Sequence, residues 1–186
     1  TLYFDDEKIF NLMRKIQEDF KEDAYKLSFL YSKFTSFAKE NMSYDEKLSM
    51  LIRASCELTS KEAPKWEYIS GRFLALEIQN TIEKETTMLD IHSFADKIRY
   101  LTKHNLYGKY MLENYSQSDI EELENYLDYS RDELFNYSGL NLVAKRYLIR
   151  DTDGKILESP QEMFMGIAMH LSIPEKDKKI RWTERI

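Results

Sequence analysis

Apolar residues recur at helical spacing along most of this chain, with polar residues between them. The first series lies three or four positions apart, at Ile9, Leu12, Met13, Ile16 and Phe20. Similar series run over about 24–40, 44–60, 64–81 and 92–104. Residues at this spacing share one face of an α-helix, so the pattern predicts a mainly α fold. The segment 24–40 is so rich in aromatic residues that we expect burial on more than one of its sides.

Residues typical of helix starts punctuate the pattern. Ser43 with Glu46, and Ser159 with Glu162, form capping boxes, and Pro160 occupies the favoured first helical position. The helix that begins at Pro160 carries four large apolar residues and should end near Pro174; they are Met163, Phe164, Ile167 and Leu171.

A third helix start is predicted at Ser116, a typical N-cap. The inner face of that helix would be formed by Ile120, Leu123, Leu127 and Leu134. Gly139 offers a position at which a helix can end.

Two short segments favour extended structure. Asp153-Gly154 is typical of a two-residue hairpin turn, and it lies between the apolar runs 147–149 and 156–157. The expected fold is therefore mainly α with one short β-hairpin near 147–157. Residues 1–4 could form another short strand.

The helical period is lost over 80–90, where β-branched threonines occur. We expect the preceding helix to end near Thr81 and a boundary between subdomains to follow. This prediction divides the chain into regions 1–82 and 83–186.

Composition limits the classes of function. The chain has 186 residues with a formal charge of −6, which argues against general nucleic-acid binding because phosphates require clustered Lys and Arg. No apolar stretch approaches the roughly 20 residues that cross a bilayer, and no signal peptide opens the chain. A single cysteine excludes an internal disulfide and suits a reducing cytoplasm.

A search for chemical motifs gives no catalytic or metal site. Cys56 has no second cysteine nearby and sits in a regular helix, so we interpret it as structural. The three histidines, His92, His104 and His170, are far apart and lack the spacing of a metal site. Thirteen tyrosines are present, and we interpret them as amphipathic residues at the edge of the core.

Two blocks of sequence resemble one known family. Residues 131–169 run from Arg131-Asp132 through an aromatic helix end to the Tyr147-Leu148 segment and the capped helix. Residues 63–72, APKWEYISGR, combine Ala-Pro with two aromatic residues, small residues and an arginine. In order and spacing, the similarity spans about 42–173. It resembles the N-terminal region of the ribonucleotide reductase large, catalytic subunit.

The resemblance implies an oxidoreductase that makes deoxyribonucleotides for DNA synthesis in the cytoplasm. In that family a thiyl radical and a cysteine pair act within an α/β barrel that follows this region. The radical source would be a metal-radical partner subunit or adenosylcobalamin, and nucleotides would act as effectors. Because the sequence ends at Ile186, before such a barrel, we expect no catalysis and no cofactor in this part. Its partners would be the rest of the large subunit, with a small subunit and a second large subunit left open.

Residues 1–82 resemble an ATP-cone, the family's ATP- and dATP-binding regulatory region. Residues 4–9 are similar to its strand-to-helix transition, and Lys8 stands at the matching lysine. The basic, glycine-containing ribbon before it is absent, and Tyr44 and Asn80 replace the expected Thr and Lys. A triphosphate needs amide and cationic partners, so the resemblance favours a degenerate cone with Lys8 as its candidate nucleotide contact.

A second interpretation of the chain remains open. A helical module that binds a protein partner through aromatic faces would show the same periodicity without any enzymatic role.

Overall fold

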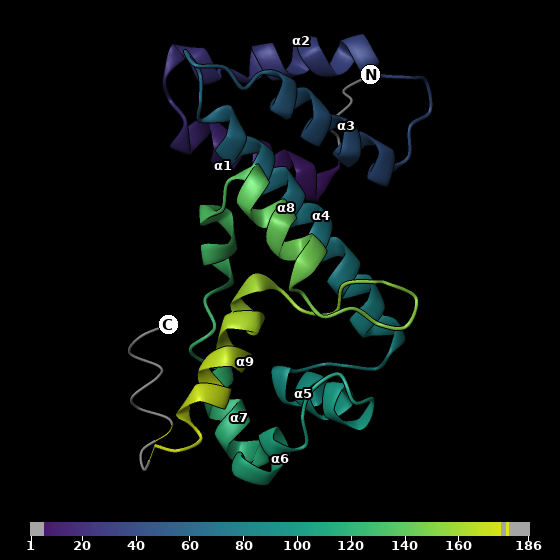
Figure 1. Ribbon diagram of the computed structural model, residues 1–186. Coiled ribbons are helices and arrows are strands. Elements are labelled where there is room, and N and C mark those ends of the chain that lie inside the picture. The colour runs from purple at the N-terminus through teal and green to yellow at the C-terminus, as the bar shows by residue number, and fades with distance from the viewer. Residues whose placement is uncertain (1–5, 176–177, 179–186) are drawn as a thin grey trace. The chain divides into compact units, whose positions relative to one another are not determined.

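The computed structural model describes residues 6–175 and 178, and within them the chain is mainly helical (Figure 1). The elements in chain order are α1 (Glu7–Asp19), η1 (Asp23–Tyr25), α2 (Leu27–Phe37), α3 (Tyr44–Glu57), α4 (Trp66–Met88), α5 (Phe94–Lys103), α6 (Tyr110–Asn114), α7 (Gln117–Glu124), η2 (Tyr129–Leu134), α8 (Tyr137–Arg146) and α9 (Pro160–Ser172), where η marks a 3₁₀ helix. The predicted mainly α fold is confirmed. The strand considered for residues 1–4 lies outside the described residues.

The chain forms two compact units. Among the described residues, unit 1 contains 6–78 together with Asp132–Val143, and unit 2 contains Gln79–Arg131 together with 144–175 and 178. The description of 1–82 as a degenerate nucleotide-binding region stays a prediction.

The core of unit 1 is built from the apolar faces that the sequence pattern indicates. α1 buries Ile9, Met13 and Ile16, and α2 packs against α3. Trp66 begins α4 almost fully buried, and its indole N–H donates to the Ala24 carbonyl at 3.0 Å. This bond satisfies the one polar atom of a large apolar side chain, so the start of α4 is anchored to the η1 turn.

The segment 24–40 is less buried than predicted. Lys26 has extended backbone and separates η1 from α2, in which Leu30 and Phe34 are buried. Phe29 and Tyr31, on the same helix, are exposed by 50% and 42%. The expectation of burial on more than one side is therefore wrong. One face of α2 packs within unit 1, and some of its aromatic residues lie outside that face.

The predicted end of the fourth helix near Thr81 is also wrong, since α4 continues to Met88. The threonine hydroxyls bond back to the helix itself: Thr86 Oγ1 donates to the Ile82 carbonyl and Thr87 Oγ1 to the Glu83 carbonyl, each at 2.7 Å. Threonine can thus satisfy its own hydroxyl inside a helix, and its weak helix propensity does not decide where the helix ends.

In unit 2, α5, α7 and α9 enclose one apolar cluster, and Figure 1 shows these helices in teal and yellow. Its members are Phe94, Ala95, Ile98, Met111, Tyr115, Ile120, Leu123, Met165 and Met169. Tyr115 also donates its hydroxyl to the Met169 carbonyl at 2.6 Å. Unit 2 therefore has an apolar core of its own.

The capping boxes at Ser43 and Ser159 are confirmed, and a third box joins Ser116 to Asp119. The predicted role of Leu134 is wrong: it lies in η2 and is 73% exposed. α7 ends at Glu124, so the helical phase that would have turned Leu134 inward is lost.

Gly139 does not end a helix, as was predicted, but lies near the beginning of α8. Its N–H donates to the Asn136 side-chain oxygen at 2.8 Å. This bond caps one of the free N–H groups at the helix start, a role that Asn performs well.

The chain reverses direction near 147–157 as predicted, but the turn differs from the predicted two-residue turn and regular strands do not form there. The Gly154 N–H donates to the Asp151 carbonyl at 3.1 Å, so the turn spans 151–154, and Gly154 takes a φ of 79°. The Asp151 carboxylate accepts two further backbone N–H groups of the turn. Such a side chain favours a wider turn than a two-residue hairpin allows. In the described part of the chain, β pairing here is limited to one isolated antiparallel bridge, between Arg150 and Ile156.

Among the residues that the structure describes, no helix is both long enough and apolar enough to cross a membrane.

Candidate functional site

Five polar side chains of unit 2 contact one another around two buried carboxyl groups, and we call them the buried carboxyl cluster. They are Lys97 of α5, Tyr107 of the α5–α6 connection, Tyr129 of η2, Glu158 before α9 and Glu162 in the first turn of α9. Lys97, Glu158 and Glu162 are each at most 5% exposed. Buried charged groups are rare unless paired, so this cluster is the most unusual chemistry in the described residues.

Glu162 is the better satisfied carboxylate of the two. Its oxygens lie 2.6 and 2.9 Å from the Lys97 ammonium, and Tyr129 donates its hydroxyl to Oε1 at 3.1 Å. The capping box adds the Ser159 N–H, 3.4 Å from Oε2. Its place in the capping box therefore fixes Glu162 at the helix start, and the Lys97 ammonium neutralises its charge.

Glu158 receives neutral donors instead. The Ile149 N–H donates to its Oε1 at 3.0 Å, and the Tyr107 hydroxyl donates to its Oε2 at 3.1 Å. Burial raises the pKa of Glu158 to about 7, although both hydrogen bonds and the more distant Lys97 act in the opposite direction. This carboxyl group can therefore exchange a proton near neutral pH.

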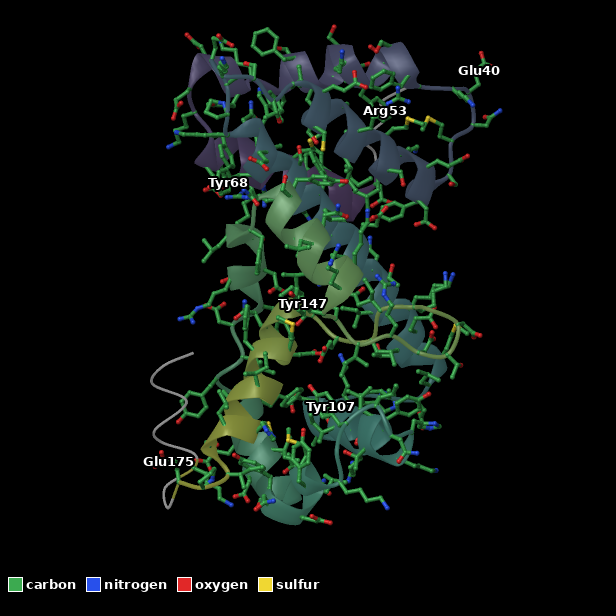
Figure 2. The ribbon with its side chains drawn as sticks, in the orientation of Figure 1. Glu40, Arg53, Tyr68, Tyr107, Tyr147 and Glu175 are labelled. Carbon is green, nitrogen blue, oxygen red and sulfur yellow. The ribbon has the colours of Figure 1, made fainter. Side chains whose placement is uncertain are left out.

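Tyr107, labelled in Figure 2, lies close against α9 at Gly166, where the absence of a side chain leaves room for it. A Cβ atom added to Gly166 would lie 2.4 Å from the Tyr107 hydroxyl oxygen, closer than any side-chain contact permits. Burial, together with the charge of Glu158, raises the pKa of Tyr107 well above its ordinary value. The phenol is therefore neutral at physiological pH and acts as a hydrogen-bonding group.

The block 63–72 forms a second structured region, in unit 1. The Arg72 guanidinium lies 2.6 Å from the Asp19 carboxylate and 4.9 Å from the centre of the Phe20 ring. Gly71 lies so close to the Phe135 carbonyl that an added Cβ would be 2.4 Å from its oxygen. These contacts join α1, α4 and the segment before α8, so the block serves the architecture of unit 1.

The candidate nucleotide contact Lys8 lies exposed in the first turn of α1, where its N–H donates to the Asp6 side chain. Tyr44 begins α3 in unit 1, whereas Asn80 belongs to the part of α4 in unit 2. The three positions of the cone comparison are thus divided between the two units, and the role of Lys8 stays a prediction.

Cys56 is half-buried in α3 of unit 1. Burial raises the pKa of its thiol, with Glu67 acting in the same direction and a hydrogen bond with Ser70 opposing it. A raised pKa lowers the thiolate fraction, which is the reactive form. This environment agrees with the structural interpretation of the cysteine.

The histidines make separate local contacts: His92 with Asp90 at 2.7 Å, His104 with the Tyr100 ring at 4.2 Å, and His170 with the Tyr110 ring at 4.7 Å between centres. Within the described ranges, no group of three or more His, Cys, Asp or Glu residues is placed to hold a metal ion.

Sequence reasoning missed the buried carboxyl cluster as a unit. It used Glu162 only as a helix cap, and it treated the tyrosines as residues at the edge of the core. One signal was available: Lys97 falls on the helical face of Phe94, Ile98 and Leu101, all of which are buried. A lysine within an apolar stripe indicates a buried acidic partner, but it does not say which one.

Comparison with known proteins shows which family the chain resembles. A family model described as "Ribonucleotide reductase, all-alpha domain" matches residues 133–186. The ribonucleoside-diphosphate reductase subunit alpha of Treponema pallidum is 42% identical over 182 residues, which is 98% of this chain and 22% of that protein. Its namesake from Enterobacteria phage T4 is 30% identical, over 92% of this chain and 22% of that protein. The chain thus spans about a fifth of the length of these relatives. It belongs to the family of ribonucleotide reductase large subunits, whose N-terminal, all-α region it matches.

Proposed function

We propose that this chain is the N-terminal part of a ribonucleoside-diphosphate reductase large subunit and packs against the rest of that polypeptide through α9. In this role it supports the enzyme without supplying a catalytic residue. The names of the relatives and the one-fifth coverage support the proposal. The half-buried Cys56, with its raised pKa, is a poor candidate for a reactive thiol.

One observation carries the proposed role of α9: this helix is apolar on both of its faces. Met165 and Met169 lie in the core of unit 2, whereas Phe164, Ile167 and Leu171 are between 40% and 55% exposed. The exposed three recur at i, i+3 and i+7 and therefore form one stripe, which we call the outer α9 face. A helix that is apolar all round is normally buried all round. The outer α9 face is thus where we expect the rest of the large subunit.

The whole enzyme would reduce ribonucleoside diphosphates to deoxyribonucleotides for DNA synthesis, in the cytoplasm. Its radical source would be a metal-radical small subunit or adenosylcobalamin, and nucleotides would act as effectors. A second large subunit is a further expected partner. All of these belong to the longer protein and would act outside the residues described above.

The coding sequence beyond Ile186 is the first test. An in-frame continuation of barrel length with separated cysteines supports the proposal, whereas a stop codon favours the helical interaction module. A second test supplies the purified 186-residue chain with ribonucleotide, reductant and a radical source. We expect no product, and stoichiometric deoxynucleotide formation would refute the non-catalytic role.

The outer α9 face can be tested with a matched pair of substitutions. Leu171→Lys alters this face, and Leu112→Lys places the same change at an exposed leucine of α6. In the isolated chain we expect both to leave the free energy of unfolding within about 0.5 kcal/mol. In the longer protein, Leu171→Lys should lower the rate of ribonucleotide reduction and Leu112→Lys should not. Equal activity of the two variants would contradict the proposed packing.

We also propose that residues 1–82 bind ATP and dATP weakly or not at all, as a degenerate cone would. Calorimetry on the chain tests this directly. Micromolar binding that Lys8→Ala abolishes would overturn the degenerate interpretation and would assign Lys8 as a nucleotide contact.

A further inference from the structure

The buried carboxyl cluster contains two acids and one base. Glu162 forms an ion pair with the Lys97 ammonium, whereas the two hydrogen-bond donors to Glu158 are neutral. If both carboxyl groups are ionised, the cluster carries a net charge of −1 in the interior of unit 2. If Glu158 is protonated, the cluster is neutral. An uncompensated charge in a protein interior is strongly unfavourable, so the neutral state fits the buried geometry better.

Several elements contribute to this balance at Glu158 and around it. α5 supplies Lys97, α9 supplies Glu162, and the α5–α6 connection supplies the Tyr107 hydroxyl. Tyr110 of α6 lies near Tyr107, and Tyr129 of η2 donates its hydroxyl to Oε1 of Glu162. The charge count of the cluster therefore depends on Lys97, Glu158 and Glu162.

Glu158 also holds a length of backbone in place. The segment 147–158, which we call the anchor segment, doubles back so that the Leu157 N–H donates to the Ile149 carbonyl at 2.9 Å. The Ile149 N–H in turn donates to the Glu158 carboxyl, and Leu157 is fully buried. Arg150 adds a hydrogen bond to the Ala144 carbonyl at 2.7 Å. A charge change on Glu158 therefore acts on the point where the two ends of the segment meet.

We propose that Glu158 and Tyr107 form a proton-sensitive anchor: Glu158 holds one proton in the folded unit, and loss of that proton to solvent loosens the anchor segment. The inference concerns unit 2 alone and stands whether or not the proposed enzyme function is correct.

The proton step needs only a reversal of one hydrogen bond. In the protonated state the Glu158 Oε2–H donates to the Tyr107 oxygen, and Oε1 accepts from the Ile149 N–H. When the proton leaves to solvent, the Tyr107 O–H rotates and donates to Oε2. The 3.1 Å distance suits either direction. Ionisation thus keeps both hydrogen bonds but leaves a buried negative charge, which favours the opened segment, where water can solvate it.

The first test measures the titration of the carboxyl groups by ¹³C NMR on the 186-residue chain labelled at glutamate. Glu158→Gln assigns the signal, and Glu113→Gln, at an exposed position of α6, is the matched control. We expect one glutamate signal with a midpoint between about pH 6 and about pH 8, absent only from the Glu158→Gln protein. A Glu158 midpoint in the ordinary range below about pH 5 would overturn the proposal.

The second test measures how easily the anchor segment opens. Amide hydrogen exchange of Ile149 and Leu157 is compared between wild type and Glu158→Gln at each pH, so that the intrinsic pH dependence of exchange cancels. The glutamine side chain of this variant copies the neutral carboxyl group. The ratio of the wild-type rate to the variant rate should rise at least about tenfold between about pH 5.5 and about pH 8.5. A constant ratio would contradict the loosening even if Glu158 titrates as expected.

A third test uses Tyr107→Phe to find out whether Tyr107 takes part in the titration of Glu158. The Tyr107 hydroxyl favours the ionised carboxyl, so its loss should move the Glu158 midpoint to higher pH. An unchanged or lowered midpoint would remove Tyr107 from the proposal.

Discussion

The two units differ in the kind of buried contact that holds their helices together. In unit 1 the buried contacts are apolar or involve backbone groups, as at Trp66 and Gly71, and its ion pairs are partly exposed. In unit 2 an ion pair, Lys97 with Glu162, lies inside the protein beside a second buried carboxyl group. Apolar packing changes little with pH, whereas a buried carboxyl group makes stability depend on pH. Within the described part of this one chain, the buried lysine and glutamate side chains therefore lie in unit 2, where we expect the stronger dependence of stability on pH.

The largest loss of stability is expected from a substitution in the core of unit 1. Trp66→Ala removes a side chain that is almost fully buried, and we expect a loss of about 4 kcal/mol in the free energy of unfolding. The loss should be equal at acidic and at neutral pH, because no titrating group is involved. Urea unfolding followed by circular dichroism measures it. A loss that varies with pH would mean that unit 1 is coupled to a buried acid.

The matching damage in unit 2 is Lys97→Met. It leaves the Glu162 carboxylate buried without its cation, and we expect a loss of about 3 kcal/mol at neutral pH. Adding Glu162→Gln should restore part of that stability, because glutamine keeps the capping box without a charge. If the double variant is no more stable than Lys97→Met, the cost arises from lost packing and not from the unpaired charge.

The pH dependence of unit 2 should come largely from Glu158. Its pKa of about 7 in the folded chain lies above the ordinary value of 4.5, so the folded state holds a proton that the unfolded state has lost. Stability from this group is complete below about pH 4.5, declines as the pH rises and is lost above about pH 7, by up to about 3 kcal/mol. The difference between wild type and Glu158→Gln in urea unfolding at several pH values isolates this contribution. Parallel curves would show that the group contributes none of the pH dependence.

A smaller effect is expected where Tyr107 meets α9. Gly166→Ala forces the Tyr107 hydroxyl away from its place, and we expect a loss of about 1–2 kcal/mol from overpacking. Tyr107→Phe in the same chain removes the closest clashing atom and should recover most of the loss. Thermal unfolding of the two variants makes the comparison, and equal melting temperatures would indicate that the clash lies elsewhere.

The smallest effect is expected at the exposed capping box of unit 1, which can be compared with the buried box at Ser159 of unit 2. Ser43→Ala removes an exposed box in unit 1 and should cost about 0.5–1 kcal/mol. Ser159→Ala removes the buried box in unit 2 and should cost about 2 kcal/mol, because the Glu162 N–H then lacks both a partner and water. Equal losses in urea unfolding would argue that burial does not strengthen the second box.

Local signals predicted much of the fold. The boxes at Ser43 and Ser159 form as predicted, because a cap depends on residues three positions apart. The predictions for Phe29 and Leu134 concerned which residues are buried, and there the periodic pattern was a poor guide. Burial depends on what another segment offers, and periodicity cannot show that. The hairpin turn failed for a related reason, since the Asp151 side chain selects a wider turn.

The sequence by itself determined where most helices begin, that the fold is mainly α, and which family the chain resembles. The first two follow from residue types at short spacing, and the third follows from the order of separated blocks of sequence. Only the tertiary structure decided that Lys97 meets Glu162, 65 positions away, and that Glu158 lies beside them without a cation of its own. It also decided that the apolar stripe at Phe164, Ile167 and Leu171 faces outward. The physical reason is that burial and charge compensation depend on distance in space, and the folded chain alone sets that distance.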